Sequence, residues 1–364
     1  MEILWLTARD FTNDLAKSTE IGVAEGLVAR GHQVSIISPG ELFSETVGHH
    51  GIKRWNFPGL KTISGARKIN NLLKNNNGVL KGIDLILVDW RYVLPLRGFL
   101  TFTNTPWCLI DRGPPADIGF LKLLQKRYWR RAWEIADLHA IGGFTVSCAH
   151  TKFVRERNGV GLRISEIPAG SSRNKFLGKK TDPSDLLEIV YVGRLDKRRG
   201  VGEILRLSEI LESSKFSYRI NIYGSGDDVF RFKKYSRENE KLYFNGVVGR
   251  NEIPEILARS HIGIMPMPDI TVWRISSPLK LAEYLAAGLM VIGPMHPGNH
   301  GDIVSKSIRL SEQRDWPITA VEEIRRAIDE GWGEIIEDSL QVSSDLSWET
   351  ITTDLDNRIL EFLS

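Results

Sequence analysis

The chain has 364 residues, a length that suits two domains better than one hydrophobic core. Hydrophobic residues make up 42% and charged residues 26%, and no apolar run reaches the roughly 18 residues of a membrane-spanning helix. The net charge of +3 is uneven, because residues 1–170 hold 22 Lys and Arg against 15 Asp and Glu (+7), whereas the remainder holds 26 against 30 (−4). We expect halves with different partners, the first facing an anionic membrane or phosphorylated lipid rather than nucleic acid, for which no motif is visible.

The first residues, MEILWLTARDF, contain an acid at position 2 and only a short apolar run before Arg9. This pattern differs from a signal peptide, which has a basic start and a longer apolar region. Cys108 and Cys148 have neither metal nor redox spacing, so we expect reduced thiols and no disulfide. Together these features predict a cytoplasmic chain.

Strand-like and helix-like segments alternate along the first half. Residues 14–32 have the apolar period of a helix. Short aliphatic or β-branched runs predict strands at 2–8, 33–40, 84–90, 107–113 and 139–147. This alternation indicates a parallel sheet covered by helices on both faces. The adjacent His49 and His50 are interpreted as a surface turn.

The segment KLLQKRYWRRAWEIAD, residues 122–137, carries much of the positive charge of the first half. Its spacing predicts an amphipathic helix with Leu123, Leu124, Trp129 and Trp133 partly buried and the basic side chains in solvent. We favour this interpretation over a membrane-binding face. The alternative stays open: if the acceptor is lipid-linked, the basic residues of this helix and the aromatic residues between them would hold the domain against an anionic membrane. They are Lys122, Lys126, Arg127, Arg130 and Arg131, with Tyr128, Trp129 and Trp133.

A segment rich in Gly, Ser, Lys and Pro at 164–185 interrupts the alternation, which then resumes. The second set of predicted strands lies at 187–195, 218–226, 241–248, 261–267 and 289–295. We therefore expect two doubly wound α/β domains joined near residues 170–180. Ligands of such sheets bind beyond the carboxyl ends of the strands, so the loops after these strands are candidate sites.

The loop after the first of these strands, YVGRLDKRRGV, combines a glycine turn with a cluster of cations. Gly193 and Arg194 are followed by Lys197, Arg198 and Arg199 just before a predicted helix. Cations at a helix start oppose the helix dipole unless an anion lies between them, and a diphosphate would supply that anion. A solvated basic turn is the alternative, and it is the better interpretation of this loop taken alone.

The loop NIYGSGDD is a weaker signal. It places Gly224 in a turn after a strand, followed by Asp227 and Asp228. A metal site there is conceivable, but the preference of Asp for turns explains both acids more simply.

The stretch RISSPLKLAEYLAAGLMVIG, residues 274–293, predicts a helix followed by a buried strand. Ser277 suits the N-cap and Pro278 the first helical position, so free N–H groups would face an anion. Lys280 and Glu283 share one helical face, where a simple ion pair would contribute roughly 0.2 to 0.5 kcal/mol. A second interpretation fits better: Glu283 accepts hydrogen bonds from a ribose whose diphosphate lies at the helix start.

These motifs resemble the retaining glycosyltransferases of family 4, which have the GT-B fold. The matching segments of the second half are VYVGRLDKRRGV, INIYGSGDD, LYFNGVVGRNEIPEILARSHIGIMPMP and SPLKLAEYLAAGLMVIG. LVARGHQVSIIS, RRAWEIADLHAIGGFTVS and EIPAGSSRNKF match more faintly, and LSWETITTDLDNRILEFL resembles the closing helix. The resemblance implies two Rossmann-like domains facing across a cleft: an acceptor-binding domain at 1–170, a nucleotide-sugar-binding domain at 171–345, and a helix at 346–364 returning to the first.

The resemblance also assigns the donor site. It implies binding roles for Gly193, Arg194, Arg199, Gly224, Arg250, Ser277, Pro278, Leu279 and Glu283. Arg194 and Arg199 would bind the diphosphate, Glu283 the ribose, and Arg250 would border the nucleobase. Arg199 replaces the lysine of the family, which keeps the charge but changes the hydrogen-bond geometry.

Three positions depart from the family pattern. Ile275 stands where a glutamate usually contacts the transferred sugar, and Asp14 and Leu15 align with a pair of glycines. Where many members have a histidine, this chain has Asp111 and Arg112. Asp111 is a candidate for orienting the sugar or the acceptor, or alternatively a strand-end carboxylate paired with Arg112.

The function implied is a metal-independent, retaining hexosyltransferase of glycan biosynthesis, with Arg194, Arg199 and Asp111 as catalytic residues. It would use a UDP or GDP sugar, no separate cofactor, and an acceptor hydroxyl on a glycan or a lipid-linked molecule at the membrane face. An epimerase or phosphorylase of the same fold is one alternative. A catalytically silent nucleotide-sugar-binding subunit is another, favoured by Ile275.

Overall fold

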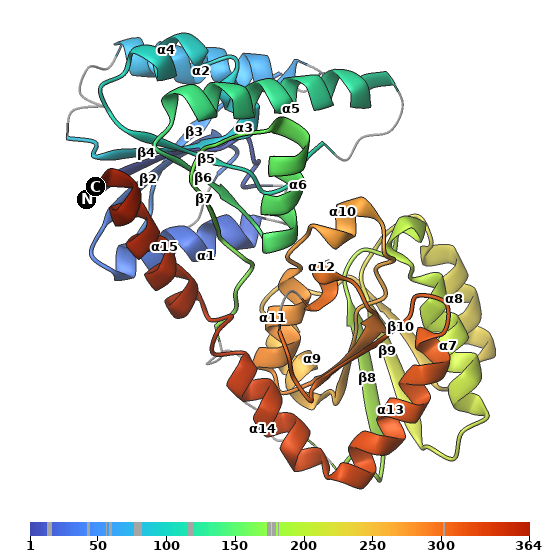
Figure 1. The fold of residues 1–364 in the computed structure, drawn as a ribbon. Coiled ribbons are helices and arrows are strands. Elements are labelled where there is room, and N and C mark those ends of the chain that lie inside the picture. The colour runs from blue at the N-terminus through green and yellow to red at the C-terminus, as the bar shows by residue number, and fades with distance from the viewer. Residues whose placement is uncertain are drawn as a thin grey trace. The chain divides into compact units, whose positions relative to one another are not determined.

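The computed structural model describes residues 1–12, 17–41, 44–55, 57, 60–75, 82–115, 120–172, 176, 180, 182–300 and 303–364. The chain divides into two compact units, Met1–Pro168 with Trp348–Ser364, and Ala169–Ser347. Each unit is a parallel sheet covered by helices (Figure 1). This confirms the predicted fold class of two doubly wound α/β domains.

The sheet of the first unit has the order β3-β2-β1-β4-β5-β6-β7 among the described residues. Its strands are β1 (Glu2–Leu6), β2 (Gln33–Pro39), β3 (Gly48–Ile52), β4 (Leu85–Asp89), β5 (Trp107–Ile110), β6 (Gly142–Thr145) and β7 (Ile164–Glu166). The order reverses between β1 and β4, and the carboxyl ends around such a point are where doubly wound sheets bind ligands.

The sheet of the second unit repeats this arrangement with the order β10-β9-β8-β11-β12-β13. Its strands are β8 (Leu187–Val192), β9 (Tyr218–Tyr223), β10 (Leu242–Gly246), β11 (Ile262–Ile264), β12 (Met290–Pro294) and β13 (Ile308–Ser311). Here the reversal lies between β8 and β11, next to the cationic loop that follows β8.

Three strands differ from the sequence-based expectation. The interpretation of His49 and His50 as a turn is wrong, because both belong to β3, which pairs with β2. The Ser38 hydroxyl and His49 Nε2 are 2.8 Å apart and link the two strands. β7 lies inside the segment interpreted as a linker, and β13 was not predicted. Segments of this kind, short and mixed in polarity, carry little periodic signal.

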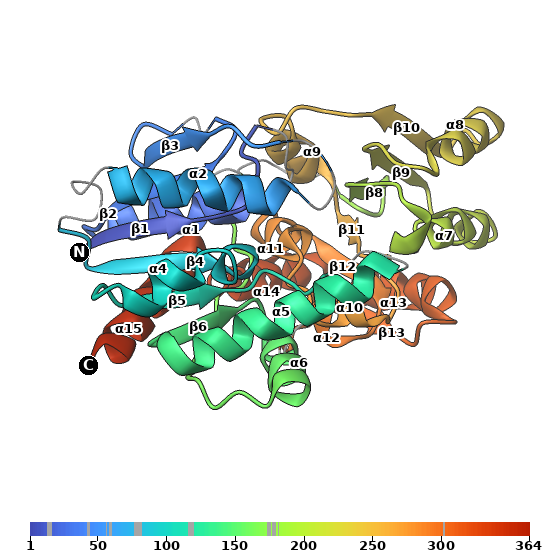
Figure 2. The ribbon, with the colours of Figure 1, turned by 90° about the horizontal axis from the view of Figure 1, so that it is seen from above.

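In the first unit, alternate residues of β1 point to opposite faces. Ile3 and Trp5 pack with the helices α1 (Lys17–Ala29) and α15 (Trp348–Leu363), whereas Leu4 and Leu6 pack under the helices of the other face. That face is covered by α2 (Lys61–Asn75), α3 (Trp90–Val93), α4 (Arg97–Phe102), α5 (Phe120–His139) and α6 (Cys148–Asn158), as Figures 1 and 2 show.

Helices α1 and α15 lie unusually close because α1 presents glycines to α15. A Cβ atom added to Gly22 would lie 2.4 Å from the Trp348 ring, and one added to Gly26 would lie 2.4 Å from the Thr352 side chain. The Arg30 Nε and Asp356 Oδ2 atoms are 2.9 Å apart at the same interface. This packing ties the segment after the second unit to the first unit.

The amphipathic helix predicted at 122–137 is part of α5, but its burial differs from the prediction. Trp129 and Trp133 are fully buried, whereas Leu123 is 59% exposed and Leu124 is 48% exposed. The two tryptophans belong to the core cluster under this face of the sheet. Neither indole is therefore available to contact a membrane.

In the second unit, helices α7 (Gly202–Glu212), α8 (Val229–Glu238) and α13 (Trp316–Glu330) pack on one face of the sheet. Helices α9 (Ile253–Arg259) and α11 (Leu279–Ala286) pack on the other, and α14 (Trp332–Val342) contacts both α11 and α13. The unit also contains the single-turn helices α10 (Thr271–Arg274) and α12 (Pro297–His300).

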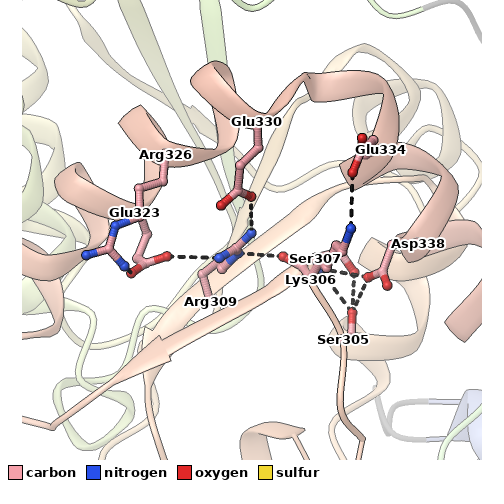
Figure 3. A network of polar contacts seen from close by, with 9 residues as sticks. All are labelled: Ser305, Lys306, Ser307, Arg309, Glu323, Arg326, Glu330, Glu334 and Asp338. Atoms are coloured by element: carbon pink, nitrogen blue, oxygen red, sulfur yellow. Dashed lines mark hydrogen bonds and ion pairs between the residues drawn. The ribbon is translucent and has the colours of Figure 1, made fainter.

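A polar network fixes the edge strand β13 of this unit (Figure 3). The Arg309 guanidinium lies 3.3 Å from a Glu323 oxygen and 2.6 Å from a Glu330 oxygen, both on α13. Asp338 on α14 accepts hydrogen bonds from the Ser305 hydroxyl and the Ser307 N–H. These contacts attach β13 and the segment before it to α13 and α14.

No helix among the described residues is long and apolar enough to cross a membrane.

Candidate functional site

The loops after β8 and β9 meet backbone to backbone. The Gly193 N–H donates to the Tyr223 carbonyl at 2.9 Å, and the Gly224 N–H donates to the Gly246 carbonyl at 2.6 Å. Gly224 has φ of +143°, and a Cβ atom added there would lie 1.8 Å from the Gly193 oxygen. Gly224, predicted to bind the nucleotide, thus has a steric reason to be glycine.

The cations after β8 are gathered by one carboxylate. Arg194 donates to both oxygens of Asp196 at 2.9 Å, and Arg199 Nε lies 3.7 Å from Asp196 Oδ2. The hydrogen bonds from Arg194, together with the charge of both arginines, lower the pKa of Asp196. Two guanidinium groups thus share one acid, which leaves a surplus of positive charge.

Arg199 and Arg198 are held differently. The Arg199 guanidinium lies 4.6 Å from the centre of the Trp273 ring, so cation–π contact fixes it on α10. Arg198 uses its backbone carbonyl to accept from Trp273 Nε1 at 3.0 Å, while its side chain is exposed. Arg199 is therefore a preorganised cation, and Arg198 is a neighbouring cation in solvent.

Lys280 is a site residue that sequence reasoning did not include in the binding set. Its Nζ lies 5.0 Å from the centre of the Tyr191 ring, and a Cβ atom added to Gly193 would lie 2.5 Å from that nitrogen. Burial, together with the charge of Arg199, lowers the pKa of Lys280 to about 7, although Glu283 acts in the opposite direction. Lys280 is thus a third cation beside the Gly193 turn.

Tyr284, one helical turn after Lys280, anchors helix α11 to β8. The Val192 N–H donates to the Tyr284 hydroxyl at 3.2 Å, and Tyr284 follows Lys280 by four residues. Residues four apart share a helix face, so the spacing of Lys280 and Tyr284 is the signal that could have placed Lys280 at the strand end. Glu283 is the only residue of 281–286 that is not fully buried.

The predicted N-cap of α11 is wrong. The cap position is Pro278, with no side-chain hydrogen bond, and the helix starts at Leu279. The Ser277 hydroxyl instead accepts from the Ala169 N–H at 2.8 Å. No capping side chain therefore accepts from the N–H groups at the start of α11, near Leu279 and Lys280. A helix start that binds an anion requires such uncapped N–H groups.

Other predicted residues lie in the loops after β9 and β10 and in the segment before α11. Arg250 is exposed in the loop after β10, and Ile275 is buried, with 4% exposure. Asp227 accepts from the Lys197 N–H at 2.9 Å, a contact between the loops after β9 and β8. No group of three metal-ligating side chains occurs in the part of the chain that the structure describes. Asp14 and Leu15 lie outside the described residues.

Asp111 belongs to the first unit and has no exposed surface. It accepts from Trp129 Nε1 at 2.6 Å, from Trp133 Nε1 at 2.9 Å and from the Gly113 N–H at 2.9 Å. His150 Nε2 lies 3.6 Å away. Burial raises the pKa of Asp111, but the charge of His150 and the hydrogen bonds more than offset it, so the pKa is lowered.

These contacts correct the interpretation of Asp111 as a residue that orients the sugar or the acceptor. The carboxylate ties α5 to β5, and a group without exposed surface does not contact a substrate in this arrangement. The alternative pairing with Arg112 is also not formed, because Arg112 Nη1 donates to the Ile167 carbonyl at 2.5 Å.

Comparisons with known proteins agree with this architecture. Residues 187–330 match the family model described as Glycosyl transferases group 1. No curated protein sequence matches the chain significantly. The sucrose-phosphate synthase of Thermosynechococcus elongatus has a similar structure, with a TM-score of 0.78 and 14% identity over 100% of this chain and 99% of that one.

Two further solved structures are similar along their whole length. Anabaena HepE in complex with UDP has a TM-score of 0.70 and 14% identity, over 99% of this chain and 100% of its own. WaaG, a glycosyltransferase involved in lipopolysaccharide biosynthesis, has a TM-score of 0.70 and 13% identity, over 97% of this chain and 98% of its own. These structures confirm the GT-B fold of the chain.

The Asp111 network yields a first prediction. Asp111→Ala leaves two buried indole N–H groups without their acceptor and removes the carboxylate that pairs with His150, so the free energy of unfolding should fall by about 3 to 5 kcal/mol. Urea unfolding followed by tryptophan fluorescence measures it, with Glu134→Gln, a half-exposed acid of the same helix, as the control. Wild-type stability of Asp111→Ala would show that the network is not structural.

Proposed function

We propose that the protein is a retaining glycosyltransferase that takes a sugar from a nucleoside diphosphate sugar, with UDP or GDP as the nucleotide. One observation carries the proposal: Arg194, Arg199 and Lys280 surround the Gly193 turn at the switch point of the second sheet. The uncapped start of α11 lies beside them. A diphosphate supplies the negative charge that this cluster lacks.

The proposed chemistry is electrostatic. As the bond between sugar and phosphate stretches, negative charge accumulates on the leaving diphosphate. Fixed cations and helix N–H groups stabilise that charge more in the transition state than in the ground state. Arg199 is suited to this role because Trp273 and Asp196 already hold it in place. We therefore propose that Arg194 and Arg199 act without a metal ion, and that no cofactor other than the donor is needed.

Glu283 completes the proposed donor site. It follows Lys280 by three residues on the half-buried face of α11, where its carboxylate can accept from the two ribose hydroxyls. Arg250, after β10, is proposed to border the nucleobase. Ile275 is apolar and buried, so this chain lacks a carboxylate where the family contacts the sugar. The identity of the sugar must then depend on other groups.

Retention at the anomeric carbon is proposed to follow the family mechanism. The acceptor hydroxyl would attack from the face that the diphosphate leaves, and a phosphate oxygen would accept its proton. A glycan or a lipid-linked molecule in the cytoplasm or at the membrane face is the proposed acceptor. The buried Ile275 also favours one alternative, a nucleotide-sugar-binding subunit without turnover.

The function is tested by ligand binding and turnover together. A thermal-shift screen with UDP, GDP and ADP identifies the nucleotide, since a ligand at about 100 times its dissociation constant stabilises by about 2.7 kcal/mol. Arg194→Ala and Arg199→Ala should each lower turnover roughly 100- to 1,000-fold. Arg198→Ala, the exposed neighbour, should lower it far less, and EDTA should leave the wild-type rate unchanged.

Each outcome distinguishes the candidates. Release of sugar and nucleotide in water supports a transferase, isomerised nucleotide sugar indicates an epimerase, and binding without turnover indicates a silent subunit. If Arg194→Ala and Arg199→Ala both retain wild-type turnover, the diphosphate assignment is wrong. Loss of activity in EDTA that Mg²⁺ or Mn²⁺ restores would contradict metal independence.

Lys280 predicts how nucleotide binding depends on pH. The free amine loses its charge as the pH rises through about 7, and a bound diphosphate returns a proton to it. Between pH 7 and 9 the affinity for UDP should therefore fall by up to about tenfold per pH unit.

Lys280→Met should bind UDP more weakly at pH 6.5, and its affinity should depend less on pH. Lys280→Arg keeps its charge and should also be flat. Parallel profiles of wild type and Lys280→Met, measured by calorimetry, would exclude this role.

The basic face of α5 is proposed to contact an anionic membrane when the acceptor is lipid-linked. Lys126, Arg127, Arg130 and Arg131 are exposed, whereas the side chain of Lys122 lies outside the described residues. Each basic residue near such a surface contributes about 1 kcal/mol. Co-sedimentation with vesicles containing phosphatidylserine should therefore occur at low salt and weaken at high salt.

The matched control uses a helix of the other unit. Changing these four α5 residues to Gln should abolish pelleting. The same charge change on α8, at Arg231, Lys233, Lys234 and Arg237, all exposed, should not. Equal loss in both variants would show a general charge effect, and no pelleting of the wild type would leave a soluble acceptor as the better proposal.

A further inference from the structure

Large apolar side chains are exposed between β3 and the first turn of α2. Trp55 is 56% exposed, Phe57 70%, Leu60 43% and Ile63 40%. Every other tryptophan of the chain is buried or half-buried. Single exposed apolar residues are normal on a protein surface, whereas several close together in the chain form an apolar patch, which marks a contact site.

Hydrogen bonds hold this apolar patch against the start of α2. The Trp55 N–H donates to the Ser64 hydroxyl at 3.1 Å, and that hydroxyl donates to the Lys61 carbonyl at 3.1 Å. The Ser64 N–H donates to the Leu60 carbonyl at 2.9 Å, and the Leu60 N–H donates to the Phe57 carbonyl at 3.1 Å. These backbone groups are therefore bonded within the patch, while its apolar side chains are left in solvent.

The segment around the patch is basic. Residues 46–83 contain seven Lys and Arg and no Asp or Glu, which equals the whole +7 excess of residues 1–170. Arg54 is held inside the unit, because it donates to the Ala8 carbonyl at 2.9 Å and lies 3.6 Å from Asp10. Among the described residues, the other cations of this segment are exposed and form no ion pair: Lys53, Lys61, Arg67, Lys68 and Lys74.

Helix α2 divides its side chains between two faces. The buried face packs into the core of the first unit through Ala66, Ile69 and Leu73. On the exposed face, Ile63 precedes Arg67 by four residues and Lys74 by eleven, so these three side chains lie along one stripe. The apolar patch is at the start of the stripe, and basic residues follow it. Helices that lie in a membrane interface typically combine exposed apolar and basic side chains in this way.

We propose that the apolar patch and the exposed face of α2 attach the protein to an anionic bilayer. The side chains of the patch enter the headgroup region, and the exposed cations contact lipid phosphates. Membrane interfaces favour tryptophan. Leu60 and Ile63 have no ring that could stack on a base, so the patch suits lipid better than single-stranded nucleic acid. Such attachment requires neither the glycosyltransferase function nor a lipid-linked acceptor.

This contact differs in kind from the one proposed for α5. The indoles of α5 are buried, whereas that of Trp55 is exposed. Helices α2 and α5 belong to the same layer (Figures 1 and 2), so the charge of α5 adds to that of α2. Attraction by both helices and insertion of the patch act together. Trp55 reports the insertion, which attraction between charges alone does not produce.

Tryptophan fluorescence with vesicles of phosphatidylcholine and phosphatidylserine tests the insertion. The difference between the spectra of wild type and Trp55→Phe isolates the emission of Trp55. This emission should shift to shorter wavelength when vesicles are added, and lipids brominated in their acyl chains should quench it. Trp55→Phe keeps an apolar ring, so it should pellet with the vesicles as the wild type does.

Serine substitutions measure the apolar contribution. Phe57→Ser, Leu60→Ser and Ile63→Ser together should lower the affinity for these vesicles about tenfold or more. The control is Phe230→Ser, which removes a side chain that is 80% exposed on α8 of the second unit. It should leave the affinity unchanged.

Glutamine substitutions measure the contribution of charge. Lys61→Gln, Arg67→Gln and Lys68→Gln together should lower the affinity about 100-fold at low salt, because each basic residue near the surface contributes roughly fivefold. The matched change on α8 replaces three exposed cations, Lys233, Lys234 and Arg237, and should have little effect.

The outcomes identify what covers the patch. Unchanged Trp55 emission with vesicles that pellet the wild type would overturn the proposal and leave α5 as the membrane contact. Full pelleting of both α2 variants, with unchanged melting temperatures, would also overturn it. So would a dimer that the serine variant dissociates, or tighter binding of poly(U) than of vesicles. Failure of UDP to bind, with insertion of Trp55 intact, would reject the donor proposal and leave this membrane contact in place.

Discussion

The second unit depends on the direct contact between two backbone turns. The Gly193 oxygen occupies the place where a side chain at residue 224 would stand, so the ends of β8 and β9 come together only with glycine there. Because neither turn has a side chain at these two glycines, the Lys280 amine can lie directly beside Gly193. A side chain on Gly193 would meet that amine at 2.5 Å. The electrostatics of the site are therefore a consequence of steric constraints on the backbone.

The second unit holds two of its cations with one carboxylate. Arg194 and Arg199 both lie against Asp196, which holds them in place without neutralising both charges. Such preorganisation reduces the cost of ordering side chains when an anion binds. In the first unit, Arg9 is paired with Glu20 on α1.

The sequence predicted most of the buried strands, because strands covered by helices on both faces form continuous aliphatic runs that are easy to recognise. It missed β3 and β13, whose burial is partial and whose residues are mixed in polarity. Arg194, Arg199 and Glu283 were predicted from local spacing and family resemblance. The contacts of Ser277 with Ala169 and of Asp111 with two tryptophans depend on long-range packing, which no local pattern reports. Lys280 lay in the predicted helix, where its spacing from Tyr284 indicates a shared face. The hydrogen bond between Val192 and Tyr284 shows that this face turns toward the end of β8.

The closure of the first unit by α15 has a consequence for biosynthesis. A ribosome produces residues 169–347 after β7 and before the helix that covers Ile3, Trp5 and Val23. Until α15 is made, Gly22 and Gly26 on α1 have no partner, and this apolar face is open to solvent. Domains generally fold as units during synthesis, in order along the chain. Here the unit that starts first finishes last. A nascent chain that ends at Ser347 would therefore carry the complete second unit and a first unit whose apolar face is still exposed, a natural target for chaperones.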